Sequence, residues 1–452
     1  MKPKQRVLAA LKNQETDRTP WVPFVGCHAA KLIGVDADDY FNSADFMVKG
    51  IEQAAERYRP DGLPALFDLQ LEAEAMGCKL QWAKQNPPAV SSHPLAEGKT
   101  LADLSVPDET SGRFPIVLDA MRRLSGGVGQ DIALYGLITG PFTLALHLMG
   151  TDIFYEMIDE PENVHEVMRF ATQVNLKTIS MYLDAGADVI AVVDPMTSQI
   201  SPDSFAEFVT PYLKNIYDAI HEKGSLGTLF VCGNATNNIE EMCRCHADGL
   251  SIDENIPLDY VRDICRDNNM SFGGNIKLTV TMLFGTPVDN VNDAMNCVNI
   301  GGKKGFILAP GCDMPFDVPP ENVEAISAYI HGEMHEFMES SNPLEGITVD
   351  LPDYKDPEHV YIDVITLDSS SCAPCQYMME AIERAAAEFG DKVICKEHRI
   401  KDKQGVVAMV ELGVKNVPTT VMDAEITFIS RIPDEAQLKE AIKKALSKKN
   451  LL

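Results

Sequence analysis

The sequence predicts two α/β domains, a large (β/α)8 barrel over residues 1–340 and a small α/β domain over residues 358–452, with a linker over residues 341–357. The chain has 452 residues and is 45% apolar, too long for one ordinary domain and rich enough in apolar residues for full cores. Eight short apolar segments alternate with helical patterns before residue 340, as in a barrel of parallel strands. A doubly wound open sheet is the competing architecture.

The eight predicted strands are short apolar runs that stop at small or polar residues, as buried parallel strands do where they open into loops. They are Trp21–Val25, Ala65–Phe67, Ile132–Ile138, Val189–Val193, the run from Gly227 to Cys232, Gly249–Ile252, Ser271–Gly274 and Phe306–Leu308. The predicted helices include Lys2–Asn13, Asp45–Tyr58, Phe114–Leu124, Pro161–Ala185, Pro202–Lys223, Asn238–Cys245 and Asn322–Glu339. Because active groups of such barrels lie at the carboxyl ends of the strands, residues directly after each run are candidates for chemistry.

Charge and cysteine content narrow the class of protein. The formal net charge is −28, nearly all of it before residue 359, and basic clusters that could bind nucleic acid are lacking. The N-terminus lacks the apolar core of a signal peptide, and eighteen uncharged apolar residues never run together, so we expect a cytoplasmic protein without membrane insertion. Eleven scattered cysteines predict thiols, metal ligands or redox groups rather than a secreted disulfide framework.

Cys232 and Cys312 are the most informative of these cysteines. Each follows a predicted strand and lies next to a glycine, in Cys232-Gly233 and Gly311-Cys312. We therefore predict that they face one another across the mouth of the barrel, although eighty residues separate them. A pair of thiols there could bind a metal ion or act on a substrate.

The other cysteines of the barrel carry less information. A lone buried cysteine usually behaves as a small apolar residue, which is our prediction for Cys78, Cys265, Cys297 and, in the small domain, Cys395. Cys243 and Cys245 lie beside His246, but positions i and i+2 of a helix point apart, which disfavours a shared metal.

The small domain carries a Cys-x-x-Cys motif between a predicted strand, Val360–Leu367, and a predicted helix, Gln376–Phe389. The helix dipole favours the thiolate of Cys372, which we predict to be the attacking nucleophile, with Cys375 as the resolving thiol. A zinc half-site is the alternative. The remaining predicted elements are the strands Val393–Glu397, Thr420–Met422 and Ile426–Ile429 and the helices Gln404–Leu412 and Pro433–Leu446.

The order of these elements resembles the thioredoxin and glutaredoxin family. In that resemblance, Val417-Pro418-Thr419 stands where the family has a cis-proline loop, which implies that Pro418 contacts the substrate of thiol exchange.

The barrel resembles the uroporphyrinogen decarboxylase superfamily over about residues 1–335, and within it the cobamide-dependent methyltransferases more than the decarboxylases. The resemblance rests on these segments: Asp17–Pro20, Phe67-Asp68, Glu72–Gly77, Gly186–Asp188, Asp194-Pro195, Ile200–Pro202 with Phe205, Phe208 and Pro211, Cys232–Asn234, Gly249–Asp253, Ala309–Asp313 and Pro320–Asn322. It implies transfer of a methyl group from a methylcorrinoid, held by a corrinoid protein, to a small thiol or similar acceptor.

The same resemblance implies zinc, held in those enzymes by a His-x-Cys pair and a second cysteine. Cys232 and Cys312 match the two cysteines, whereas the histidine position is Phe230, which cannot bind metal. A tetrahedral site with one open position needs three protein ligands. The substitutes at other strand ends are His28, Cys27, Asp253 and Glu254, with His28 and Glu254 ranked first.

Polar residues after other strands receive generic roles. We predict that Asp194 takes part in catalysis, or is a structural carboxylate, and that Asp68, Asp253 and Asn275 contact substrate or corrinoid. The decarboxylases bind the propionates of their substrate through an arginine-rich N-terminal loop, and here that segment reads Gly26-Cys27-His28-Ala29-Ala30, which disfavours a polycarboxylate substrate.

Two other functions remain open at this point. One is a decarboxylase-like lyase, and the other is a metal-free protein that binds a corrinoid or thiol compound and relays redox equivalents. Without a third ligand, Cys232 and Cys312 could form a dithiol that Cys372 and Cys375 reduce, or Cys372 could itself accept the methyl group. A homo-oligomer is compatible with each of these functions.

Overall fold

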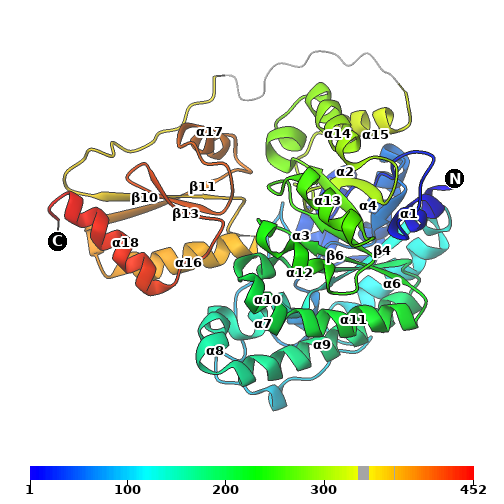
Figure 1. Ribbon diagram of the computed structural model, residues 1–452, viewed down its shortest axis with the longest axis horizontal. Helices are drawn as coiled ribbons and strands as arrows, with labels where there is room; N and C mark the ends of the chain where they lie inside the picture. The colour runs from blue at the N-terminus through cyan, green and yellow to red at the C-terminus, as the bar shows by residue number, and fades with distance from the viewer. Residues whose placement is uncertain (334–345, 371, 452) are drawn as a thin grey trace. The chain divides into compact units, whose positions relative to one another are not determined.

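The computed structural model describes residues 1–333, 346–370 and 372–451, and its chain forms two compact units, Met1–Ser340 and Ser341–Leu452 (Figure 1). Residues 341–345 of the predicted linker lie outside the described residues, so the assignment of 341–357 as a linker stays a prediction.

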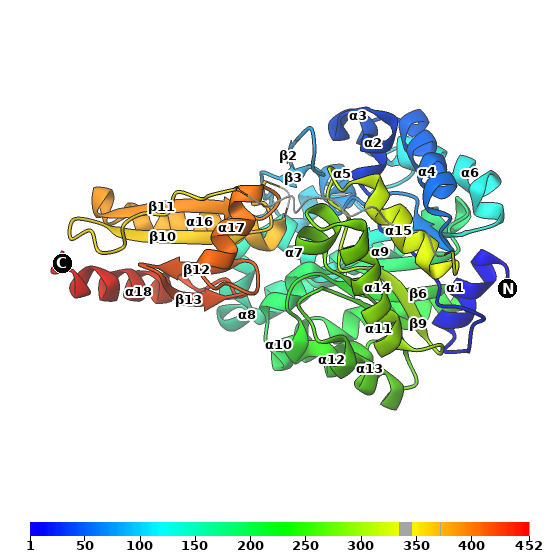
Figure 2. The same cartoon turned by 90° about the horizontal axis from the view of Figure 1, so that it is seen from above.

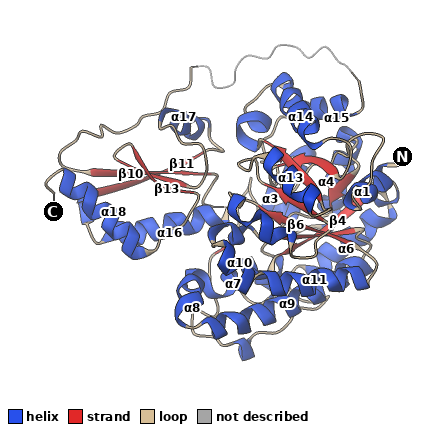
Figure 3. Cartoon of the chain, in the orientation of Figure 1, coloured by secondary structure: helices blue, strands red, loops and turns tan. Residues whose placement is uncertain are grey.

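The first unit is built on a seven-stranded parallel sheet with the strand order β1-β4-β5-β6-β7-β8-β9, drawn in red in Figure 3. Its strands are β1 (Gly62–Pro64), β4 (Ala133–Thr139), β5 (Val189–Val193), β6 (Leu226–Val231), β7 (Gly249–Ile252), β8 (Ser271–Ile276) and β9 (Phe306–Pro310). Because every pairing is parallel, all seven carboxyl ends lie at one edge, as the barrel prediction requires.

An extended segment at residues 20–22 bridges the two outer strands of this sheet. The carbonyl oxygen of Pro20 accepts a hydrogen bond from Leu308 N of β9, and Val22 N donates to Leu308 O. On the other side, Trp21 O accepts from Asp61 N beside β1. The ring is therefore closed through this segment, and the predicted α/β barrel class is confirmed.

The predicted first strand, Trp21–Val25, is wrong as a regular strand, because only Trp21 forms a bridge, to Leu308. Pro20 and Pro23 flank that bridge and lack the N–H groups that a ladder with two neighbours requires. The second predicted strand, Ala65–Phe67, is displaced: pairing of β1 with β4 runs from Gly62 to Pro64.

Helices cover the outside of the barrel (Figure 2). Their bounds are α1 (Pro3–Leu11), α2 (His28–Ile33), α3 (Ala37–Phe41), α4 (Ala44–Tyr58), α5 (Leu71–Ala75), α6 (Phe114–Gly126), α7 (Pro141–Met149), α8 (Ile153–Asp159), α9 (Pro161–Asp184), α10 (Pro202–Phe208), α11 (Thr210–Glu222), α12 (Ile239–Cys243), α13 (Leu258–Asp267), α14 (Pro287–Gly301) and α15 (Pro320–Ile330). A short hairpin pairs β2 (Leu80–Gln81) with β3 (Ala89–Val90).

Two predicted helices differ from those observed. The segment Pro202–Lys223 is split into α10 and α11, because Pro211 has no N–H to continue the hydrogen-bond pattern of the preceding helix. The helix predicted over Asn322–Glu339 ends at Ile330, where Gly332 follows the C-cap with a φ of 73°. Residues 334–339 of that prediction lie outside the described residues.

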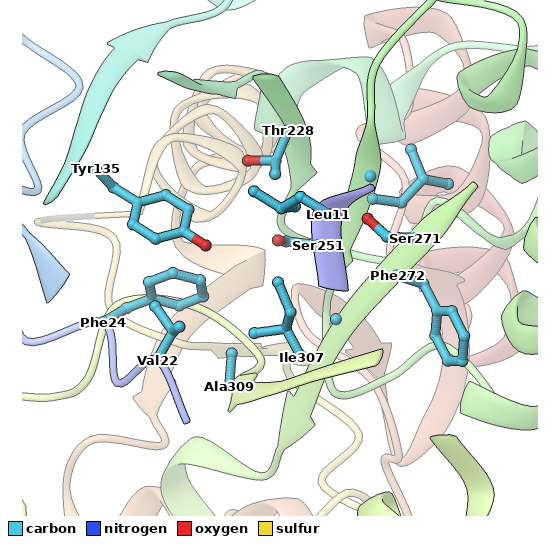
Figure 4. A pocket seen from close by; sticks show the side chains of 13 residues that line it. Leu11, Val22, Phe24, Tyr135, Thr228, Ser251, Ser271, Phe272, Ile307 and Ala309 are labelled. Carbon is cyan, nitrogen blue, oxygen red and sulfur yellow. The ribbon is translucent and has the colours of Figure 1, made fainter. Parts of the chain in front are cut away.

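The interior of the barrel is a packed core. Its buried members include Phe24, Phe67, Tyr135, Val193 and Phe230. Toward the amino ends of the strands, near Leu11 and Ser271, the side chains of Figure 4 leave a cavity of about 10 Å³, about enough for one water molecule. This cavity is therefore too small for a corrinoid or a thiol compound.

The second unit is a four-stranded sheet with the order β11-β10-β12-β13, in which β10 and β11 are parallel and the other pairs antiparallel. Its elements are β10 (Val360–Thr366), α16 (Ala373–Ala387), β11 (Val393–Arg399), α17 (Lys403–Glu411), β12 (Thr419–Met422), β13 (Glu425–Ile429) and α18 (Glu435–Lys448). The Val417–Pro418 peptide bond before β12 is cis, and the small α/β domain predicted from sequence is confirmed.

Within the described residues, no helix combines the length and apolar character needed to cross a membrane.

Candidate active site

Cys232 and Cys312 meet at the carboxyl edge of the barrel. Cys232 directly follows β6, and Cys312 follows β9 by two residues, with β7 and β8 between these strands in the sheet. Their Sγ atoms lie 2.6 Å apart, and both side chains are half-buried. The ring of strands therefore brings the two thiols into contact, as the sequence predicts.

Residues after β7 fix the backbone of both cysteine loops. The carboxylate of Asp253 accepts a hydrogen bond of 2.8 Å from Gly233 N, next to Cys232. The backbone of Glu254 lies against Gly311, where a Cβ atom would come within 2.6 Å of Glu254 N. Only glycine fits at position 311, and this close packing positions Cys312. Asp313 adds a third tie, because it accepts from Gly26 N at 2.7 Å.

Three phenylalanine rings lie below the thiols. Phe230 is buried, with its ring centroid 4.9 Å from that of Phe24 and 6.1 Å from that of Phe67. Cys232 packs against the same apolar cluster. Because positions 230 and 232 are two apart on an extended chain, their side chains share one face, and Phe230 lies beside Cys232 at the position where the resemblance drawn from the sequence implies a metal-binding histidine.

The proposed substitute ligands are engaged elsewhere. His28 is fully buried; its Nδ1 lies 3.0 Å from Phe316 O and its Nε2 lies 2.7 Å from the hydroxyl of Tyr58. Burial lowers the pKa of His28 to about 4. Cys27 is buried, with its thiol 3.8 Å from Met314 O. Neither side chain is presented to the pair of sulfur atoms.

Glu254 is also a poor metal ligand. Its carboxylate accepts a hydrogen bond from Leu278 N, and burial, together with the neighbouring Asp253 carboxylate, raises the pKa of Glu254 to about 8. To bind a metal ion, this group would have to give up both its proton and its hydrogen bond to Leu278 N. Among the described residues, no three His, Cys, Asp or Glu side chains form a group that could hold a metal. Two sulfur atoms without a third ligand do not fit a tetrahedral zinc site.

Asp253 and Asn275 have contacts that build the edge of the barrel. Asp253 accepts hydrogen bonds from the backbone and side-chain nitrogens of Asn255, in addition to Gly233 N. The side-chain nitrogen of Asn275 donates to the carbonyl oxygens of Asp253 and Ile256. These bonds favour a positioning role, and direct contact of either side chain with a substrate stays a prediction.

Asp194 is buried beyond the reach of solvent. Its carboxylate accepts from Phe142 N at 3.2 Å, Thr143 N at 2.7 Å and Thr143 Oγ1 at 2.6 Å, and so caps α7 from across the sheet. Burial raises the pKa of Asp194 to about 6. These contacts favour the structural alternative, and a catalytic role for Asp194 stays a prediction.

Asp68 lies in a buried ion pair. Its Oδ2 is 2.7 Å from Arg113 Nη2, and its Oδ1 accepts from Gln70 N. Arg113 also pairs with Glu74 and covers the ring of Trp82. Arg113 thus neutralises Asp68, whose predicted contact with substrate remains a prediction.

Glu72 is a buried carboxyl group to which the sequence reasoning gave no role. It accepts hydrogen bonds from Thr139 Oγ1 at 3.0 Å and from Thr139 N at 3.3 Å, and burial raises its pKa to about 7. The burial of Glu72 could not be predicted from its residue type, because glutamate side chains are usually exposed.

This burial predicts a pH-dependent effect of Glu72→Gln. The native state holds the Glu72 proton up to about pH 7 and the unfolded state releases it near pH 4.5, so Glu72 lowers stability as pH rises between these values. The free energy of unfolding of Glu72→Gln minus that of the native sequence should therefore increase by up to about 3 kcal/mol from pH 4.5 to pH 8. Urea unfolding at both pH values measures the change, and an equal difference at the two would contradict it.

The second unit presents its own pair of thiols. Cys372 is the N-cap of α16 and half-buried, and its N–H donates to Asp368 O. Cys375 is buried, its Sγ accepts from Leu367 N at 3.3 Å, and burial raises its pKa well above the ordinary value. The more accessible thiol is thus Cys372 and the enclosed one Cys375, and their roles as attacking and resolving thiols stay predictions.

Two further buried cysteines of the barrel, Cys265 and Cys297, have hydrogen-bonding partners. Cys265 is buried as expected, but its thiol is hydrogen-bonded to that of Cys243, so it is not without polar company. Cys297 is buried and donates to the side-chain oxygen of Asn275 at 3.8 Å. Helices α12 and α13, which carry Cys243 and Cys265, follow one another on the ring, a neighbourhood that spacing along the chain does not reveal.

The fold and the position of the site define the class of protein: residues 2–332 match the uroporphyrinogen decarboxylase (URO-D) family, and the chain belongs to that family. Residues 360–443 match a thioredoxin domain. Both family resemblances seen in the sequence are thus confirmed.

The similar proteins include both methyltransferases and decarboxylases. The chain is 28% identical to the methylcobamide:CoM methyltransferase MtbA of Methanosarcina acetivorans over 330 residues, which cover 71% of this chain and 95% of that protein. It is 25% identical to a chloroplastic uroporphyrinogen decarboxylase of Arabidopsis thaliana over 338 residues, 70% of this chain and 83% of that one. The solved structure of a methyltransferase from Methanosarcina mazei matches with a TM-score of 0.68 and 27% identity, covering 74% of this chain and 99% of the other.

Proposed function

We propose that this chain is a methyltransferase that moves a methyl group from a methylcorrinoid to a small thiol at the barrel mouth. The observation that carries the proposal is the contact of Cys232 with Cys312 at the carboxyl edge of a URO-D barrel. The methyltransferases named above support it, because the match covers nearly their whole length. By the same likeness, we propose a corrinoid protein as the partner that presents the methyl donor.

The reaction is an in-line displacement. The sulfur of the acceptor thiol attacks the methyl carbon, the carbon–cobalt bond of the donor breaks, and its electron pair stays with cobalt. The acceptor must lose its proton, because the thiolate is the nucleophile. Two sulfur atoms 2.6 Å apart can hold one proton between them. We propose that this thiol–thiolate pair accepts the proton of the acceptor.

Zinc is outside this proposal, although family likeness implied it. The described residues offer two thiols, whereas the third position is filled by Phe230 in a cluster of aromatic rings. No step above depends on a metal ion.

The lyase alternative has less support. In the segment where the resemblance implies the arginine-rich loop of the decarboxylases, Ala29 and Ala30 are fully buried, as is His28. That segment offers neither a positive charge nor an exposed surface to the propionates of a porphyrinogen. The many thiols of the chain suit a reducing compartment, and we propose that the protein acts in the cytoplasm.

The proposed activity is tested with the reduced full-length chain, free methylcobalamin carrying a labelled methyl group, and a panel of small thiols. We expect label on the added thiol, detected by mass spectrometry, and loss of methylcobalamin, detected by its absorbance. A rate no higher than that of a Cys232→Ala, Cys312→Ala double variant would overturn the proposal. Label on Cys372 alone would instead identify that thiol as the acceptor.

Zinc content provides a second prediction. The purified, reduced chain is expected to hold far less than one zinc per chain, whereas Phe230→His should bring it to about one, because an imidazole at position 230 faces the same side as Cys232. Elemental analysis measures both. The matched control is Phe67→His, which places an imidazole in the same cluster of rings but on a different segment of the chain. This variant should leave the zinc content low. Stoichiometric zinc in the native sequence would contradict the prediction.

A further inference from the structure

We propose that Cys232 and Cys312 form a reversible disulfide, and that the Cys372 and Cys375 dithiol reduces it by thiol–disulfide exchange. The proposal deepens the proposed function, on which it rests for its consequence: oxidation removes both sulfur atoms from the methyl-transfer site and stops the reaction. It adds a redox modification site to the barrel.

The first argument is the position of the sulfur atoms. They are 2.6 Å apart in an arrangement that the backbone imposes through Asp253 on one loop and the packing of Gly311 on the other. Disulfide formation requires two cysteines that can approach without backbone movement. Here the two side chains already face one another in contact, so little conformational entropy opposes the bond.

The second argument is what surrounds the pair. Metal-binding would protect the thiols from oxidation, but the described residues supply no third ligand, and the rings of Phe24 and Phe230 lie beneath. Both thiols are half-buried, so a small oxidant can reach them. By contrast Cys27, Cys245 and Cys297 are buried and enclosed, and the half-buried Cys243 lies on α12, away from the mouth.

The third argument is the reductant on the same chain. Cys372 is half-buried at the start of α16, and Cys375 is buried one turn further along the same helix. Burial raises the pKa of Cys375, so this thiol keeps its proton until Cys372 has formed the mixed disulfide that Cys375 attacks. This is the division of labour that reduction of another disulfide requires.

The exchange balances as follows. The Cys372 thiolate attacks one sulfur of the Cys232–Cys312 disulfide, a mixed disulfide forms, and the other barrel sulfur leaves as a thiolate that takes a proton. Cys375 then loses its proton and attacks Cys372, releasing the second barrel thiol. The net change reduces the barrel disulfide and oxidises the Cys372–Cys375 dithiol, with two electrons and two protons transferred. Oxidation of the barrel pair in the first place requires a small-molecule disulfide of the glutathione class.

The test uses full-length protein oxidised with glutathione disulfide, alkylated and digested. We expect a peptide that joins Cys232 to Cys312. After a limiting amount of dithiothreitol, this peptide should disappear about tenfold more slowly in Cys372→Ser than in the native sequence. In Cys375→Ser, Cys372 should be trapped in a mixed disulfide with Cys232 or Cys312.

The control is Cys243→Ser, which removes a half-buried thiol from α12, outside the mouth, and should change neither the joined peptide nor its reduction. Failure to detect the Cys232–Cys312 peptide would overturn the proposal, and equal reduction rates with and without Cys372 would overturn its second half. Because the readout is a peptide mass, it does not depend on methyl transfer, and loss of the proposed function would be seen separately in the labelled-methyl assay.

Discussion

Replacing Cys232 or Cys312 with alanine is expected to lower kcat/KM for methyl transfer by on the order of 10²-fold or more, the usual loss when a general base is removed. An alanine at either position leaves a single sulfur atom, which has no partner with which to hold the proton of the acceptor. Because the two sulfur atoms act as a unit, the double variant should lose about as much as either single variant. Initial rates with methylcobalamin and a small thiol provide the measurement.

Two comparisons keep this result interpretable. Cys243→Ser should keep its rate within about twofold of the native sequence, because this thiol pairs with Cys265 on the outer helices. An acceptor thiol acidic enough to be ionised already should restore most of the lost rate, since it needs no base. Additive losses in the double variant, or no rescue by the acidic thiol, would show that Cys232 and Cys312 act in some other way.

Much of the site could be predicted from the sequence because strand ends are local features. Apolar runs that stop at Gly-flanked cysteines gave the positions of Cys232 and Cys312, and parallel pairing alone requires these ends to share an edge. β5 and β7 were predicted with the bounds observed. Phe230 was identified as a departure only through the family resemblance, which implies a histidine at that position.

What could not be predicted depends on partners far apart in the chain. Cys265 appears apolar in sequence, yet its thiol meets Cys243 on the neighbouring helix. The engagement of both nitrogens of His28 depends on Tyr58 and Phe316, and the raised pKa of Glu254 on burial at the sheet edge. The failure at Trp21–Val25 was avoidable, because Pro20 and Pro23 already excluded a regular central strand.

Asp61 has ion-pair and hydrogen-bond partners that lie far from it in the chain. Its contacts take the place of the strand hydrogen bonds that Pro20 and Pro23 cannot donate. Its buried carboxylate lies 2.5 Å from Arg6 and 2.6 Å from Arg18, and it accepts from Trp21 N at 2.9 Å. The backbone of Asp61 also donates to Trp21 O. One residue thus binds the segment at 20–22 to β1 and holds α1 through Arg6, at the point where the barrel closes.

Asp61→Ala is therefore expected to destabilise the barrel by about 3–5 kcal/mol, the cost of leaving buried charges without their partner. Arg6 is almost fully buried and cannot turn to solvent, whereas Asp17, its other partner, is half-exposed. Asp17→Ala removes a charge from the same arginine and should cost at most about 1 kcal/mol, which makes it the matched control. Asp61→Asn keeps an acceptor for Trp21 N and should fall between the two.

Tryptophan fluorescence during urea unfolding reports on this unit alone, because Trp21 and Trp82, the two tryptophans of the chain, both belong to it. If Asp61→Ala and Asp17→Ala unfold with the same free energy, the closure does not depend on the buried carboxylate, and the hydrogen bonds between residues 20–22 and β9 must hold it. If the free energy of unfolding of Asp61→Ala is lower than that of Asp17→Ala by several kcal/mol, the ion-pair network of Asp61 closes the barrel where a regular eighth strand is missing. Leu308, four residues before Cys312, pairs with residues 20–22 on one side and with β8 on the other. Asp61 would then help to position Cys312, because it holds residues 20–22 against β9.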